Sequence, residues 1–87
     1  MTNKQLLKRL QYQQNKLLNI KDYSFDVESN NSKDLGIYFY VYIHDGRKDQ
    51  KIIFNDSFSI TDELLNFKLC RLKDCIDGLL NNQTTRN

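Results

Sequence analysis

Three tyrosines in strict alternation are the residues of this sequence best suited to binding chemistry. Tyr38, Tyr40 and Tyr42 alternate with the apolar residues Ile37, Phe39, Val41 and Ile43. Because side chains of a strand point to opposite faces in turn, the tyrosines share one face and the apolar residues share the other. A tyrosine offers a large contact area with little rotamer freedom to lose and a polar tip. The pattern predicts a strand with one buried face and one face available to a partner.

Acidic residues are expected beside these tyrosines. Asp26 and Glu28 alternate with apolar residues in a neighbouring predicted strand, and carboxylates beside a ring repel the phosphates of a nucleic acid. A protein partner is therefore favoured. The expected partner-binding residues are Tyr38, Tyr40, Tyr42, Asp26, Glu28, Asp49 and Lys51. Two alternatives stay open: the tyrosines stabilise the sheet through cross-strand pairs, or the first helix covers them.

No residue pattern indicates catalysis or a cofactor. The sequence contains no glycine-rich phosphate loop, no His/Cys metal cluster and no nucleophile motif. Cys70 and Cys75 lie five residues apart in a predicted helix, so they point about 140° apart and suit neither a mutual disulfide nor a shared metal. We expect them to be small buried side chains in a reducing compartment. The sequence predicts a non-enzymatic protein without cofactor or metal.

Charge is distributed unevenly along the 87 residues, although the net charge is only +2. Residues 1–21 hold five bases and no acid, whereas residues 22–63 hold nine acids and four bases. A basic first helix is the feature of an alternative, nucleic-acid-binding function. Its candidate residues are Lys4, Lys8, Arg9 and Lys16. Without any binding function, the same residues would form a solvent-exposed helix face, or would hold the helix against the acidic sheet of its own chain by electrostatic attraction.

Two helices and three strands are predicted to position these residues. Residues 2–19 contain good helix formers and no Gly or Pro, and residues 23–28 alternate as a short strand. Residues 29–34 are polar and predict a connecting loop. The last helix is expected to begin between Ser59 and Thr61, ahead of a stripe formed by Leu65, Leu69, Leu72, Ile76 and Leu79.

The stretch 35–54 predicts a β-hairpin. Asp45-Gly46 favours a two-residue turn, which pairs Phe39 with Ile52 and Ile37 with Phe54 on the apolar face. Ile53 then falls on the tyrosine face. A longer turn through Arg47-Lys48 is the alternative.

The expected fold class is α+β, in the order α-β-β-β-α. Three antiparallel strands form a meander, and both helices pack on the Ile37/Phe39/Val41 face. Residues 1–80 form one domain, and residues 81–87 form a flexible polar tail. No apolar run reaches the length of a membrane span.

Two resemblances accompany this fold. The element order resembles the double-stranded-RNA-binding domain, but that family has a lysine-rich start to its second helix where this sequence has Asp62-Glu63. The sequence also resembles small proteins of bacteriophages and mobile elements, through Asn30-Asn31, Asn81-Asn82 and Lys51-Ile52-Ile53. Many of those are single-domain inhibitors of host machinery, including anti-CRISPR proteins.

The second resemblance implies an inhibitor that sterically blocks a host nuclease or complex in the host cytosol. Its partner would be a host protein or a protein–nucleic acid complex. A homodimeric structural protein is a further alternative, since small domains often gain stability by association.

Overall fold

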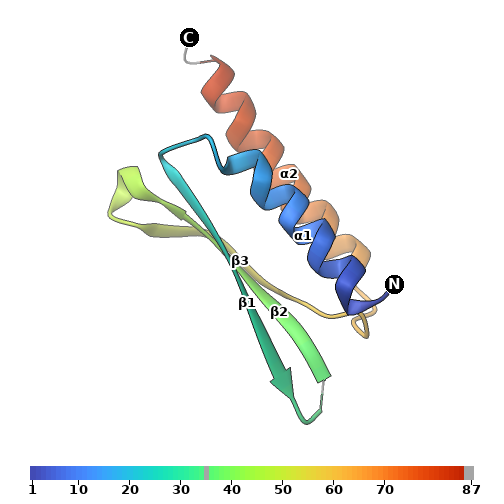
Figure 1. The fold of residues 1–87 in the computed structure, drawn as a ribbon. Coiled ribbons are helices and arrows are strands. Elements are labelled where there is room, and N and C mark those ends of the chain that lie inside the picture. Colours follow the sequence, from blue (N-terminus) through green and yellow to red (C-terminus); the bar gives the residue numbers. More distant parts are fainter. Residues whose placement is uncertain (35, 86–87) are drawn as a thin grey trace.

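The computed structural model describes residues 1–34 and 36–85 and confirms the order α-β-β-β-α (Figure 1). Leu35, where the predicted hairpin stretch begins, lies outside the described residues, as do the last two residues of the predicted tail. The elements are α1 (Asn3–Leu17), β1 (Tyr23–Ser32), β2 (Gly36–Asp45), the short 3-10 helix η1 (Gly46–Lys48), β3 (Lys51–Phe58) and α2 (Leu65–Thr85).

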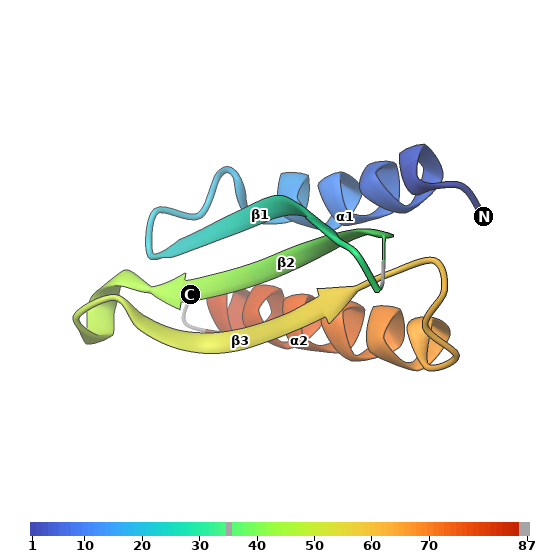
Figure 2. The same ribbon diagram turned by 90° about the horizontal axis from the view of Figure 1, so that it is seen from below.

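The strands form an antiparallel meander in the order β1-β2-β3, and both helices lie on the same side of it (Figures 1 and 2). The helices run side by side in the same direction, with α1 against β1 and β2 and α2 against β3. Between the layers lies the core. Its fully buried side chains are Phe58, Leu6, Leu10, Ile43, Leu72, Ile76 and Val41. The predicted two-layer architecture is confirmed.

Helix α1 begins with a capping box. The Thr2 hydroxyl accepts the Gln5 N–H at 3.1 Å, and the Gln5 side chain accepts the Thr2 N–H at 2.8 Å. Leu6, Leu10 and Leu17 recur at helical spacing and are buried against the sheet. A hydrogen bond also connects α1 to the sheet, because the Gln14 side-chain amide donates to the Phe25 carbonyl at 2.8 Å.

Strand β1 is longer than predicted. Residues 29–32, expected to belong to a polar loop, continue the strand and pair in register as far as Ser32 with Gly36. The prediction was wrong because backbone pairing continues without apolar side chains once a neighbouring strand lies alongside. Gly36 begins β2 at a φ of +69°, a conformation that favours glycine.

The predicted two-residue turn at Asp45-Gly46 is wrong, and the longer-turn alternative is correct. Gly46–Lys48 form η1, and Asp49 and Gln50 follow with φ of 55° and 61°. Phe39 therefore pairs with Phe58 and Ile43 with Phe54, and a bulge follows Ile43.

The bulge reverses the expected sides of two isoleucines. Ile52 pairs with His44 and is 46% exposed, whereas Ile53 is partly buried against the core. Phe54 is buried as predicted. A bulge adds one residue to a strand and so changes the face of every side chain beyond it.

Helix α2 begins at Leu65 and not between Ser59 and Thr61. Turns precede it, because the Ser59 hydroxyl accepts the Thr61 N–H at 3.2 Å and the Asp62 carboxylate accepts the Leu64 N–H at 2.9 Å. The predicted stripe packs as expected, with Leu65, Leu72 and Ile76 buried. The helix extends to Thr85, beyond the predicted domain end at residue 80. Within the described residues, neither helix has the length and apolar character needed to cross a membrane.

Candidate protein-interaction face

Strand β2 places Tyr38, Tyr40 and Tyr42 in one row, which we call the tyrosine row. The ring centroids of Tyr38 and Tyr40 are 5.7 Å apart in an edge arrangement, and those of Tyr40 and Tyr42 are 5.7 Å apart and stacked at 10°. The His44 ring extends the row, with its centroid 6.3 Å from that of Tyr42. The contacts hold each ring against its neighbour, so the row is a preformed aromatic surface.

The alternation of β2 puts the tyrosine row on the face of the sheet opposite its buried residues, which we call the open face. Figure 2 shows that both helices lie on the other side of the sheet. Phe39, Val41 and Ile43 are buried on the helix side, and Tyr40 is 36% exposed on the open face. Because α1 packs its leucines against the helix side, the alternative in which the first helix covers the tyrosines is excluded.

Strand β1 supplies an acidic border to the row. Glu28 pairs with Tyr40 and Asp26 with Tyr42, as their alternation predicts. The Asp26 carboxylate lies 3.7 Å from His44 Nδ1. Partial burial withholds water from the Tyr42 hydroxyl, and Glu28 adds a negative charge nearby, so the pKa of Tyr42 is raised above its ordinary value.

A first concavity of about 390 Å³ opens between this border and the bulge. Its lining comprises Asp26, Val27, Glu28, Tyr42, His44 and Ile52. The bulge is what brings Ile52 here, so the site combines two carboxylates with an exposed aliphatic side chain and two rings.

A second concavity, of about 600 Å³, lies on the other flank of the tyrosine row. Its lining comprises Tyr38, Tyr40, Ser57, Ser59, Thr61, Asp62, Glu63 and Leu64. The turns that delay the start of α2 hold these acids beside the row. Lys68 Nζ donates to Asp62 at 2.7 Å, and this bond together with the Leu64 N–H lowers the pKa of Asp62. Asp62 is therefore already paired with a cation, and the exposed Glu63 is the acid that this flank offers to a partner.

Asp49 and Lys51 do not join this site. In the observed register Tyr42 pairs with Asn55 and Tyr40 with Ser57, while Lys51 pairs with Asp45 at the end of the strand. Asp49 lies in the loop after η1. Their predicted placement beside the tyrosines depended on the two-residue turn at Asp45-Gly46, and it is wrong because the observed loop is longer.

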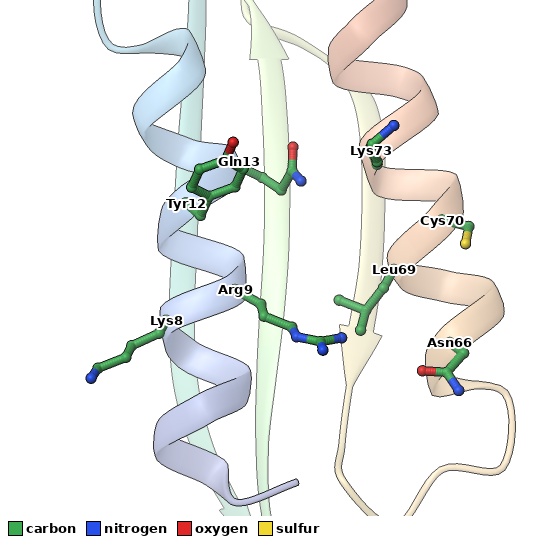
Figure 3. A pocket seen from close by; sticks show the side chains of 8 residues that line it. All are labelled: Lys8, Arg9, Tyr12, Gln13, Asn66, Leu69, Cys70 and Lys73. Atoms are coloured by element: carbon green, nitrogen blue, oxygen red, sulfur yellow. The ribbon is translucent and has the colours of Figure 1, made fainter.

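The alternative nucleic-acid-binding residues lie in the opposite layer, on α1. Lys16 Nζ lies 3.8 Å from the Asp77 carboxylate and 5.0 Å from the centroid of the Tyr12 ring. Lys4 is exposed on the first turn, and Lys8 and Arg9 line a groove between α1 and α2 (Figure 3). Lys16 is therefore already paired with an acid, whereas Lys8 and Arg9 are exposed and extend to different sides of α1 (Figure 3).

The cysteines differ from their expectation. Both are free thiols, but Cys70 is exposed and only Cys75 is partly buried, which raises the pKa of Cys75. Cys70 lines the helix groove. Among the described residues, no group of three or more His, Cys, Asp and Glu side chains could hold a metal ion.

Comparisons with protein-family models, with curated proteins and with solved structures find no match for this chain. The geometry of the chain itself is therefore the basis on which its function is inferred. Sequence reasoning placed His44 on the face of the tyrosines, but missed Ile52, Asp62 and Glu63 as neighbours of the tyrosine row. Alternation alone extends the row to His44, whereas the other three depend on the loop length and the turns after β3.

Proposed function

We propose that this chain is a non-enzymatic protein-binding domain that uses its open face. One observation carries the proposal: a preformed tyrosine row lies between two acid-lined concavities. Tyrosine is enriched among the residues that dominate binding energies, and it contributes most where surrounding contacts exclude water. Concavities on both flanks of the row would receive side chains of the partner.

The proposed partner presents basic side chains. An Arg or Lys inserted in either concavity would contact a tyrosine ring and approach a carboxylate, and both interactions favour a cation. Glu28 and Glu63 are exposed and available for such pairs. A symmetric homodimer through this face is disfavoured, because it would bring the acidic borders of two copies together.

From the resemblance to phage inhibitors, we propose that binding of this domain inhibits its host partner. A host nuclease or protein–nucleic acid complex has a basic surface where it holds phosphates. An acidic, rigid domain bound there would exclude the nucleic acid sterically. This proposal places the protein in the host cytosol.

Capture from a host-cell extract tests the proposal, with the wild type compared with a Glu28→Lys/Tyr40→Ala variant. The matched control is Tyr12→Ala, which removes an exposed tyrosine from the helix layer. We expect mass spectrometry to identify a host protein captured by the wild type and by the control but lost with the variant. Equal capture by all three proteins would contradict the proposal, provided that circular dichroism shows each of them folded.

A further inference from the structure

A groove of about 510 Å³ lies between α1 and α2, in the helix layer and away from the tyrosine row. Helix α1 contributes Lys8, Arg9, Tyr12 and Gln13, and α2 contributes Asn66, Leu69, Cys70 and Lys73 (Figure 3). The two helices run side by side with their buried stripes turned to the sheet. The sides of α1 and α2 that face away from the sheet therefore form the two walls of a groove that runs along the helices.

Apolar side chains line much of this groove. Tyr12 is 64% exposed, Leu69 is partly buried against the core, and Cys70 is exposed. A helix that packs only against a sheet normally places such residues on its buried stripe. Leu69 belongs to the buried stripe of α2, whereas Tyr12 and Cys70 lie on the outer flank, where a further packed element would shield them from water.

The charged side chains of the groove are all basic. Lys8, Arg9 and Lys73 line it, and no acid does. Figure 3 shows Arg9 extending from α1 toward Leu69 of α2, across the groove, whereas the Lys8 side chain extends to the side of α1 that is turned away from α2. Within the part of the chain that the structure describes, neither Lys8 nor Arg9 makes an ion pair, whereas Asp77 at one end is shared by Lys16 and Lys73.

We propose that this groove binds an acidic amphipathic helix of a second protein. A helix laid between α1 and α2 would cover Tyr12 and Leu69 with its apolar stripe, the usual way in which a helix occupies a groove. Its acidic residues would pair with Arg9, Lys8 and Lys73. The partner on this side thus has the opposite charge to the one proposed for the open face, so the domain bridges two different proteins.

A nucleic acid fits this groove less well. Phosphate binding is mainly electrostatic and needs no apolar floor. A second copy of the chain, with its acidic open face on this groove, would make a head-to-tail contact that does not close and would lead to filaments.

A display library tests the proposal directly. Its peptides, about 14 residues long to favour helix formation, have apolar residues at i, i+3, i+4 and i+7 and a free choice of Glu, Gln or Lys elsewhere. Selection on the wild-type protein is expected to enrich Glu. Enrichment of Lys, or no enrichment at all, would overturn the proposal.

The best enriched peptide then distinguishes the surfaces. Lys8→Glu/Arg9→Glu is expected to weaken its binding about tenfold or more. Tyr12→Ala should also weaken it, whereas the charge-matched control Lys21→Glu/Lys33→Glu and the open-face variant Tyr40→Ala should not. Retained affinity in the Lys8→Glu/Arg9→Glu variant contradicts the proposal.

Two further measurements address the other occupants. A single-stranded or duplex DNA oligonucleotide that binds at physiological salt more tightly than the peptide, and is lost with Lys8→Glu/Arg9→Glu, would identify a nucleic-acid site instead. Sedimentation of the wild type as an oligomer that this variant dissociates would identify a self-association surface. The proposal expects neither result. It also stands apart from the function proposed for the open face, since Tyr40→Ala affects only that face.

Discussion

At the scale of single residues, Asp45 decides how β2 ends. Its carboxylate is buried and accepts the Arg47 backbone N–H at 2.9 Å and the Arg47 Nε–H at 3.2 Å. The Arg47 guanidinium also donates to the Tyr23 hydroxyl and lies over the Tyr23 ring. These bonds form η1 and lengthen the loop, and so they set the register of β3.

Replacement of Asp45 should therefore destabilise the protein. We expect Asp45→Ala to lower the free energy of unfolding by about 2 kcal/mol, through lost hydrogen bonds at a buried position. Urea denaturation monitored by circular dichroism measures the change. Asp34→Ala, at an exposed turn position, is the control, and an equal effect of the two substitutions would show that Asp45 has no special role.

The Asp62–Lys68 pair gives a pH dependence with a defined sign. The pKa of Asp62 lies below its ordinary value of 3.8, because Lys68 and the Leu64 N–H stabilise the carboxylate. A lowered pKa means that the carboxylate contributes stability above pH 4, and that this contribution is lost as the pH falls through the folded-state pKa.

Asp62→Asn should consequently be less stable than the wild type at neutral pH, and the difference should shrink as the pH falls below about 4. Asparagine retains the oxygen that accepts the Leu64 N–H, so the comparison isolates the charge. Urea unfolding across this pH range measures the difference. A difference that stays constant with pH would mean that the charge of Asp62 does not stabilise the fold.

At the scale of elements, the bulge in β3 divides Ile52 from Ile53. The two residues are adjacent in sequence and have the same side chain, but only Ile53 packs against the core. We expect Ile53→Ala to lower the free energy of unfolding by about 1–2 kcal/mol and Ile52→Ala by less than about 0.5 kcal/mol. The turn predicted from sequence requires the reverse order, so thermal or urea denaturation of the pair tests the register.

Local patterns explain which elements could be predicted. The alternation of β2 and the leucine stripes of both helices depend on neighbours in sequence, and both are observed. The sequence offered the longer loop after Asp45 only as an alternative to the two-residue turn, because the choice depends on Arg47 donating to Tyr23, a contact between distant residues. The start of α2 was missed because Ser59 and Asp62 cap turns in place of the helix itself.

The residues of the candidate site also fall into those that the sequence predicts and those that it does not. Tyr38, Tyr40, Tyr42, Asp26 and Glu28 come from two strands whose alternation is visible in the sequence, and the structure brings them together. Glu63 reaches the row only because β3 ends beside Tyr40, and Asp49 misses it because the loop is longer. Residues within one strand are predictable, whereas those placed by register are not.

At the scale of the whole molecule, the two layers present surfaces of different character. The open face combines a tyrosine row with acids, and the helix layer carries a basic groove with an apolar floor. Each surface suits a partner of opposite charge, and the core between them holds both in fixed positions. The fold thus places the two proposed surfaces in different layers, one built from residues 26–64 and the other from the two helices that flank them in sequence.

Site-specific photo-cross-linking tests the central claim, that the open face binds a protein, most directly. A photoreactive phenylalanine analogue is placed at Tyr40 in one variant and at Leu18 in another, since Leu18 is exposed and lies outside both proposed surfaces. Irradiation in host-cell extract should join one host protein to position 40 and none to position 18, and Glu28→Lys should abolish the adduct. Equal labelling at both positions, or none at position 40, would contradict the claim.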